Sequence, residues 1–322
     1  MACFAPGLGR RGPVELMLQG FVPMKARRIG LGLLALSGLV TGVTAAGVLV
    51  LTRRTKGRHA ELDDVQIHYT DEGAGEPVLL VHGFAVNADL NWRRPGIIKA
   101  LSADYRVIAM DLRGHGRSGK PPLGRYGMAL VHDIPRLLDH LDIERVHLVG
   151  YSLGGFVALK CAATYSDRLL SVAALGSGWE PLDQAGSLFQ SLSALADELE
   201  AGRGIGPLAG HLGPGRQQPG LLHRSWVKVL TSAFNDKRAL VGIIRGLPDL
   251  AITADELQAL QVPICSIVGA KDPLVDGVRA MDGLVPDHSV TIIEGADHIR
   301  APLRRELLEA LRTFLQQHSD AS

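Results

Sequence analysis

The sequence is poor in cysteine and in aromatic residues, and its positive and negative charges nearly cancel. Its three cysteines, Cys3, Cys161 and Cys265, form no disulfide framework, and no pair of them has metal-ligand spacing. A formal net charge of +1 gives no indication of nucleic-acid binding. The sequence also shows no P-loop and no cluster of metal-ligating residues. These absences exclude a disulfide-stapled mini-protein, and they lead us to expect neither a nucleic-acid partner nor a cofactor.

The composition that is present is that of a globular protein with an unusual amino-terminal segment. Of the 322 residues, 46% are hydrophobic and 21% are charged, so the chain can bury a sizeable core. Residues 1–58 hold nine of the 34 lysine and arginine residues but a single acidic residue, which leaves the remainder net acidic. A basic, apolar leader in front of an acidic body favours attachment to a membrane.

The leader contains one long apolar run. From Ile29 to Leu51 no residue is charged, and these 23 residues would span about 34 Å as a helix at ~1.5 Å per residue. We therefore expect a disordered basic leader over 1–28, an uncleaved transmembrane signal-anchor over 29–51 and a linker over 52–64. The alternative is a secreted protein whose signal is cleaved near Thr44, although the apolar run continues beyond that point. A second open question is whether translation starts at Met1 or Met24.

Beyond the leader, short apolar runs alternate with amphipathic segments. Strands are expected at Val65–Thr70, Val78–Val81, Val107–Met110, Val146–Val149, Val172–Leu175, Ile264–Val268 and Val290–Ile293, and helices at Asn91–Leu101, Met128–Leu141, Leu153–Thr164 and Leu303–Gln317. Continuous apolar strands alternating with helices are typical of a parallel sheet that is covered on both faces. We therefore predict an α/β domain over residues 65–320, with a mostly parallel, doubly wound sheet.

The alternation breaks between residues 179 and 260. Helical patches at Leu188–Leu199, Leu222–Phe234 and Lys237–Leu247 flank a stretch rich in glycine and proline, and a capping box at Thr253 opens a short helix. A helical insertion between two strands would cover one end of the sheet, so we expect a lid over approximately 179–260.

The most informative motif is Gly150-Tyr-Ser-Leu-Gly-Gly155, which follows a predicted strand and opens a predicted helix. This is the Gly-x-Ser-x-Gly pattern in the context that it requires, because a sharp strand-to-helix turn exposes the serine hydroxyl. Ser152 is therefore a candidate nucleophile. A serine hydroxyl becomes a good nucleophile only when an imidazole accepts its proton and an acid orients that imidazole.

Two ionisable residues downstream fit these two roles. Asp272 follows the strand Ile264–Val268, and His298 follows the strand Val290–Ile293. The carboxyl ends of parallel strands meet at one edge of a sheet, which places both residues at the same edge as Ser152. The order serine, acid, histidine is the order found in α/β-hydrolases.

The chain from about Val65 to its end resembles the α/β-hydrolase fold family. The resemblance rests on Val81-His-Gly-Phe84, Asp111-Leu-Arg-Gly-His-Gly-Arg-Ser118, the turn at Ser152, Gly269–Asp272 and Gly295–His298, all in the family's order. It implies that Ser152 is the nucleophile, His298 the general base and Asp272 the orienting acid. It also implies that the backbone N–H groups of Phe84 and Leu153 form the oxyanion hole.

Each assignment has a simpler alternative. Asp183 is the main rival to Asp272, because some members of the family place the acid after the strand that ends at Leu175. Asp297 and Asp276 are expected to be turn and loop residues, and His82 and His115 to be structural.

Haloalkane dehalogenases and epoxide hydrolases are disfavoured, because they carry a carboxylate where this chain has Ser152. Trp179 and Trp226 are candidates to line an acyl pocket, whereas Trp92 is expected to pack in the core.

The sequence thus predicts a membrane-attached serine hydrolase that cleaves the carboxylic ester, or a related acyl bond, of a small molecule without a cofactor. A C–C bond hydrolase or a lyase/synthase could use the same three residues, because the difference between these reactions lies in the lid pocket. A non-catalytic ligand receptor on the same fold is the alternative from another class.

Overall fold

The structure, a computed structural model, describes residues 55–319 except for residues 64, 123, 125, 180–187 and 202–235. The predicted leader and anchor lie outside this part of the chain, as does the beginning of the predicted linker. Among the described residues, no helix combines the length and the apolar character that crossing a bilayer requires.

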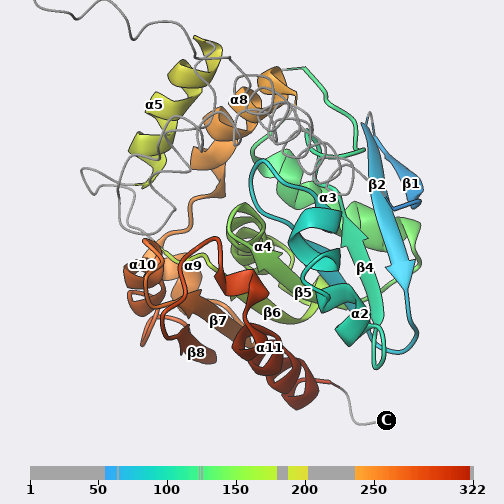
Figure 1. Cartoon of the computed structure of the whole chain (residues 1–322), viewed down its shortest axis with the longest axis vertical. Helices are drawn as coiled ribbons and strands as arrows, with labels where there is room; N and C mark the ends of the chain where they lie inside the picture. Colours follow the sequence, from blue (N-terminus) through green and yellow to red (C-terminus); the bar gives the residue numbers. More distant parts are fainter. Residues whose placement is uncertain are drawn as a thin grey trace, which may run out of the picture. The chain divides into compact units, whose positions relative to one another are not determined.

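An eight-stranded sheet forms the centre of the domain, with the strand order β1-β2-β4-β3-β5-β6-β7-β8 (Figure 1). The strands are β1 (Arg58–Leu62), β2 (Val65–Glu72), β3 (Pro77–Val81), β4 (Arg106–Met110), β5 (Val146–Tyr151), β6 (Leu169–Leu175), β7 (Ile264–Gly269) and β8 (His288–Ile293). Strands β3 to β8 are parallel, whereas β1 and β2 pair antiparallel at one edge. The predicted mostly parallel sheet is confirmed.

Helices cover both faces of this sheet, because its central strands are apolar on both sides. The helices are α2 (Ile97–Leu101), α3 (Met128–His140), α4 (Leu153–Thr164), α5 (Leu188–Glu200), α8 (Lys237–Gly246), α9 (Ala254–Gln258), α10 (Val275–Arg279) and α11 (Arg305–Gln317). In β3, Leu79 and Val81 pack in one cluster with side chains of α3 and α4. Val78 and Leu80 point to the other face and pack with side chains of α2 and α11. Alternate side chains of a strand therefore supply two separate cores.

Two segments differ from the sequence-based expectation. Residues 58–62, which the sequence assigned to the linker, form strand β1. This strand has no continuous apolar run, and it pairs with β2 through backbone groups. The single helix expected over residues 91–101 is instead a π-helical turn, η1 (Asp89–Arg93), followed by α2. Gly96 separates the two in a left-handed conformation with φ 84°, which ends one helical segment before the next begins.

The segment between β6 and β7 is helical where it is described. Helices α5 and α8 pack against each other, and their apolar side chains join the core cluster on the α3 and α4 side. The predicted capping box is present, since Thr253 and Glu256 exchange side-chain and backbone hydrogen bonds at the start of α9. The helix expected at residues 222–234 lies outside the described residues.

Candidate active site

Ser152 lies in a sharp turn between strand β5 and helix α4. Its backbone has φ 54° and ψ −115°, a region that non-glycine residues rarely adopt. The turn needs glycines around Ser152 because neighbouring backbone atoms leave no room for a side chain. An added Cβ at Gly150 would overlap the Gly154 carbonyl, and one at Gly154 would overlap the Val81 carbonyl. An added Cβ at Gly155 would overlap the Ser177 side chain. The turn therefore holds the Ser152 side chain at the carboxyl edge of the sheet.

The structure brings Ser152, His298 and Asp272 together. His298 Nε2 lies 3.0 Å from Ser152 Oγ, and His298 Nδ1 lies 2.7 Å from Asp272 Oδ2. Asp272 is 1% exposed and His298 5% exposed, whereas Ser152 is half-buried. The buried carboxylate also accepts a hydrogen bond from the Leu274 N–H at 2.9 Å, which orients it toward the imidazole. Ser152 is therefore accessible to a small molecule, whereas His298 and Asp272 are shielded from solvent.

The other carboxylates near this edge lie elsewhere. Asp297, next to His298, accepts hydrogen bonds from the backbone N–H groups of Ile299 and Arg300, as expected for a turn residue. Asp276 is exposed and pairs with Arg279 at 3.0 Å. Asp183 lies outside the described residues. Of the carboxylates that the structure describes, Asp272 is the one hydrogen-bonded to the imidazole of His298.

Two further serines contact a histidine, and burial separates them from Ser152. Ser171 Oγ lies 2.7 Å from His147 Nδ1, whose other nitrogen lies 2.9 Å from Glu76. Ser266 Oγ lies 2.9 Å from His288. Both serines are fully buried within strands, so no substrate can reach them. A serine–histidine hydrogen bond is thus not sufficient to mark a reactive serine; its exposure is needed as well.

Tyr151 is a residue of this site that the sequence did not indicate. Its hydroxyl donates a hydrogen bond to the backbone carbonyl of His298, and the two rings lie 5.4 Å apart. Burial, with Asp272 and Asp297 nearby, raises the pKa of Tyr151 well above its usual value, so the hydroxyl keeps its proton. Its place beside the serine in the motif was the available signal.

The loop after β3, residues 82–88, passes beside Ser152. An added Cβ at Gly83 would lie 3.3 Å from Ser152 Cβ, so the backbone before Phe84 is next to the serine. On the other side, Leu153 is the first residue of α4, and the N–H of a first helical residue has no acceptor within its helix. Phe84 and Leu153 thus lie on the two backbone segments next to Ser152.

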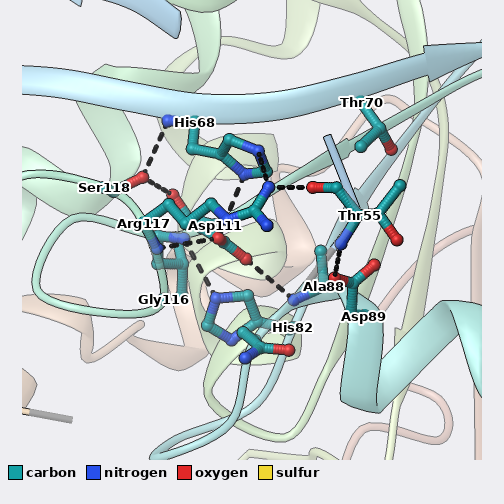
Figure 2. Close-up of polar contacts among 12 residues, drawn as sticks. Thr55, His68, Thr70, His82, Ala88, Asp89, Asp111, Gly116, Arg117 and Ser118 are labelled. Atoms are coloured by element: carbon teal, nitrogen blue, oxygen red, sulfur yellow. Dashed lines mark hydrogen bonds and ion pairs between the residues drawn. The ribbon is translucent and has the colours of Figure 1, made fainter. Parts of the chain in front are cut away.

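A second loop, residues 111–118, supports the first through a network centred on Asp111 (Figure 2). Asp111 Oδ1 accepts from the Ala88 N–H at 2.9 Å, Oδ2 accepts from the Arg117 N–H at 3.0 Å, and His68 Nδ1 lies 3.1 Å from Oδ2. Burial alone would raise the pKa of this carboxyl, but His68, His82 and the two backbone donors outweigh burial and hold the pKa well below its usual range. Asp111 therefore stays ionised in the protein interior.

The amino-terminal end of the described chain joins the same network. The Thr55 N–H donates to Asp89 Oδ2 at 2.9 Å, and the Thr55 carbonyl accepts from the Arg117 guanidinium (Figure 2). Arg113 forms a buried bidentate pair with Asp133 of α3, at 2.7 and 2.5 Å. The 111–118 loop is thus tied to α3 and to the segment that enters the domain.

Within the described part of the chain, no three histidine, cysteine or carboxylate side chains are grouped so that they could hold a metal ion. Trp92 is fully buried, as expected for a packing residue. Trp179 lies beside Phe156 and Leu159 of α4 in a small apolar pocket, with its indole N–H bonded to the Ile252 carbonyl at 2.7 Å. Trp226 lies outside the described residues.

Comparison with known proteins places this geometry in a family. The chain has the α/β-hydrolase fold, and its residues 76–202 match the model of that family.

Among curated relatives, an acetoin-cleaving dihydrolipoyllysine-residue acetyltransferase component from Pseudomonas putida is 31% identical over 257 residues, which are 76% of this chain and 64% of that protein. The chain thus spans less than two thirds of that relative's length. A pimeloyl-[acyl-carrier protein] methyl ester esterase from Aliivibrio fischeri is 27% identical over 79% of this chain and 98% of its own.

Solved structures show the same fold. An esterase from Thermogutta terrifontis superimposes with a TM-score of 0.68 and 24% identity, over 83% of this chain and 100% of that one. A bacterial membrane phospholipase A superimposes with a TM-score of 0.67 and 25% identity, over 92% of this chain and 100% of that one. The relatives differ in the reactions that their names state, so the fold alone specifies no reaction for this chain.

Proposed function

We propose that this protein is a serine hydrolase that cleaves a carboxylic ester through Ser152, His298 and Asp272. The observation that carries the proposal is the chain of hydrogen bonds from Ser152 Oγ to His298 Nε2 at 3.0 Å and from His298 Nδ1 to Asp272 at 2.7 Å. This chain ends at a half-buried serine in a strained turn, whereas Ser171 and Ser266 are sealed in strands.

The proposed reaction proceeds in two halves. In the first, Ser152 Oγ attacks the ester carbonyl while its proton passes to His298 Nε2, and the tetrahedral intermediate collapses when His298 protonates the departing alcohol. In the second, His298 takes a proton from water, the hydroxide attacks the acyl carbon, and the proton returns to Ser152 as the acid is released. The Asp272 carboxylate stabilises the imidazolium that forms in each half.

The negative charge that develops on the carbonyl oxygen would be stabilised by the N–H groups of Phe84 and Leu153. Backbone donors fixed in a water-poor site need no reorganisation during the reaction, and one such donor contributes roughly 3–4 kcal/mol to stabilising the transition state. The amino terminus of α4 adds a favourable partial positive charge behind Leu153.

The names of similar proteins support an ester as the bond. A methyl ester esterase, a thermophilic esterase and a phospholipase A are among the proteins that this chain resembles. C–C bond cleavage or a lyase/synthase reaction on the same three residues is the second candidate, and a non-catalytic receptor is the third. These three candidate functions use the same fold, and the shape of the pocket at Ser152 would distinguish them.

Hydrolysis of p-nitrophenyl esters of increasing acyl length tests the proposal. We expect turnover with an optimum in chain length, and its loss in Ser152→Ala. The matched control is Ser171→Ala, which removes the hydroxyl of a second serine–histidine–carboxylate chain and should leave kcat within a few-fold of the unmodified enzyme. No turnover at any chain length would shift support to the C–C hydrolase or the receptor.

We further propose that residues 29–51 anchor the enzyme in a membrane and that a lid lies over approximately 179–260. The 23-residue uncharged run supports the anchor, and the similarity to a protein named a membrane phospholipase A covers 92% of this chain. The substrate would then be a small molecule that carries an acyl ester and is accessible from the membrane surface.

A further inference from the structure

The backbone of the loop at residues 82–88 is held by side chains and backbone of the loop at residues 111–118. The hydrogen bonds that join the loops include three from backbone N–H groups: Leu112 to His82 Nε2 at 3.0 Å, Ala85 to His115 Nε2 at 3.1 Å, and Ala88 to Asp111 Oδ1 at 2.9 Å. Two of the three acceptors are imidazole nitrogens, and an imidazole nitrogen accepts only when it carries no proton. The support of the 82–88 loop therefore depends on neutral histidines.

The first of these histidines controls one end of the peptide unit that carries the Phe84 N–H. Because His82 Nε2 accepts from Leu112, its proton resides on Nδ1, which donates to the Gly83 carbonyl at 2.7 Å. The carbonyl of Gly83 and the N–H of Phe84 belong to one planar trans peptide and point in opposite directions. Holding the Gly83 carbonyl thus fixes the plane of the Phe84 N–H, but a second contact is needed to fix the residue that follows.

That contact comes from His115. Ala85 has φ 58°, a left-handed conformation that is unfavourable for alanine and persists only when its surroundings hold it. The Ala85 N–H donates to His115 Nε2, and the His115 ring packs edge-on against His82 at 4.9 Å and against Phe84 at 6.1 Å. His115 therefore touches the loop on both sides of the Phe84 amide.

The surroundings of His115 keep it neutral. The ring is fully buried, and burial, together with the neighbouring His82, lowers the pKa of His115 well below its usual value. Asp111 and the Arg113 carbonyl act in the opposite direction, and Lys120 adds to the lowering. Nε2 thus remains an acceptor for Ala85 at neutral pH.

We propose that His115 is a positioning residue of the reaction: by accepting the Ala85 N–H it holds the left-handed turn that aims the Phe84 N–H at the substrate carbonyl oxygen. This proposal rests on the proposed function, since it supposes that Phe84 is an oxyanion donor. His115 touches neither substrate nor reacting atoms and acts through the backbone of the 82–88 loop.

A pair of substitutions isolates the acceptor. His115→Gln places an amide oxygen near the position of Nε2, whereas His115→Met has nearly the same length and volume but only a weak acceptor. Hydrogen exchange of the 82–88 segment, followed by mass spectrometry in the full-length protein, reads the loop without any need for turnover. We expect faster exchange in His115→Met and exchange close to that of the unmodified protein in His115→Gln.

Kinetics supply the second readout. We expect His115→Met to lower kcat for a p-nitrophenyl ester by roughly 10- to 100-fold with little change in KM, because an oxyanion contact acts mainly in the transition state. His115→Gln should recover most of this loss. The control is His147→Met, which removes another fully buried, hydrogen-bonded histidine at the other end of the strands; it should lower the melting temperature and leave kcat within a few-fold.

The outcomes separate this proposal from the proposed function. Equal exchange and equal kcat in the methionine and glutamine variants would overturn the role of His115, as would a kcat loss in His147→Met as large as that in His115→Met. If the unmodified enzyme turns over no ester, the proposed function fails. Hydrogen exchange then still decides whether His115 holds the loop, and unchanged exchange in His115→Met would reject that role.

Discussion

In a neutral imidazole, a proton on His298 Nδ1 leaves the lone pair on Nε2, and Nε2 lies 3.0 Å from the Ser152 hydroxyl. The 2.7 Å hydrogen bond to Asp272 favours this tautomer, and the Tyr151 hydroxyl donates a hydrogen bond to the backbone carbonyl of the same histidine. Orientation of the imidazole therefore depends on two buried groups, one acidic and one neutral. Neither would be replaceable by a side chain that only fills space.

Ser152→Ala and His298→Ala should each lower kcat by several orders of magnitude with little effect on folding, because the two groups act in one proton transfer. The double variant should be about as slow as either single variant, since residues that act as a unit are strongly non-additive. Steady-state kinetics of the three variants test this expectation. Losses that multiply in the double variant would show that the residues do not share one mechanism.

Asp272→Asn should lower kcat by about 10⁴-fold, because an amide in place of the carboxylate favours the wrong tautomer of His298. Asp276→Asn is the matched comparison, since Asp276 lies four residues away and is exposed. It should cost less than a few-fold, and we expect the same of Asp183→Asn. A reversed ranking of Asp272 and Asp183 in kcat would identify Asp183 as the acid.

The turn between β5 and α4 is the element that presents the serine, and it depends on glycines with no room for a side chain. Gly154→Ala should lower the free energy of unfolding by about 3 kcal/mol or more, because the new Cβ would meet the Val81 carbonyl of β3 and a strand must move. Gly283→Ala has open space around it but φ 75°, so we expect a loss of about 1–2 kcal/mol. Urea denaturation compares the two, and equal losses would contradict the close packing of α4 on β3.

Asp111 of the 111–118 loop makes a pH-dependent contribution to the stability of the fold. Its pKa is lower in the folded than in the unfolded chain, so its contribution to stability is present above the unfolded value of about 3.9 and declines as the pH falls toward the folded value. In Asp111→Asn an amide N–H₂ would face a backbone donor. This variant should be less stable than the unmodified protein at pH 7, with a gap that narrows below about pH 4 in denaturation curves. A gap that is constant with pH would show that Asp111 is not ionised in the fold.

Elements with strong apolar patterns could be predicted from the sequence, and those that depend on backbone pairing could not. The strands β3, β5 and β7 are buried on both faces and read as continuous apolar runs. Strand β1 was missed because its residues are mostly polar and it is held by pairing with β2. The break at Gly96 was missed because a single glycine can either stand inside a helix or end it, and the sequence alone does not distinguish the two cases.

The residues of the candidate site were also predictable where a local motif marks them, and not where they meet only in the fold. The motifs and their order predicted Ser152, His298 and Asp272, with Asp183 left as the rival to Asp272. The contact between Asp272 and His298 joins the ends of two strands and is seen only in the fold. The Tyr151 and His115 contacts join residues that are 147 and 30 positions apart in the chain. Such contacts follow from the way the strand ends meet, and periodicity carries no information about them.

At the scale of the whole molecule, the amino-terminal leader should determine where the enzyme resides. The full-length protein should remain in the membrane fraction after a carbonate wash, because 23 uncharged residues bury too much apolar surface to be released by alkali. A chain that starts at residue 54, which keeps Thr55 and its two backbone hydrogen bonds, should be soluble and retain esterase activity. A mature chain that starts near Gly47 would indicate a cleaved signal, and an intact chain released by carbonate would rule out the anchor.

Labelling of the full-length enzyme with a fluorophosphonate, followed by peptide mapping by mass spectrometry, tests directly whether Ser152 is an activated nucleophile. We expect one covalent adduct, on the peptide that contains Ser152, with labelling lost in Ser152→Ala, strongly slowed in His298→Ala and unchanged in Ser171→Ala. No adduct on Ser152 at reagent concentrations that label other serine hydrolases, or equal labelling of Ser152 in the presence and absence of His298, would contradict it.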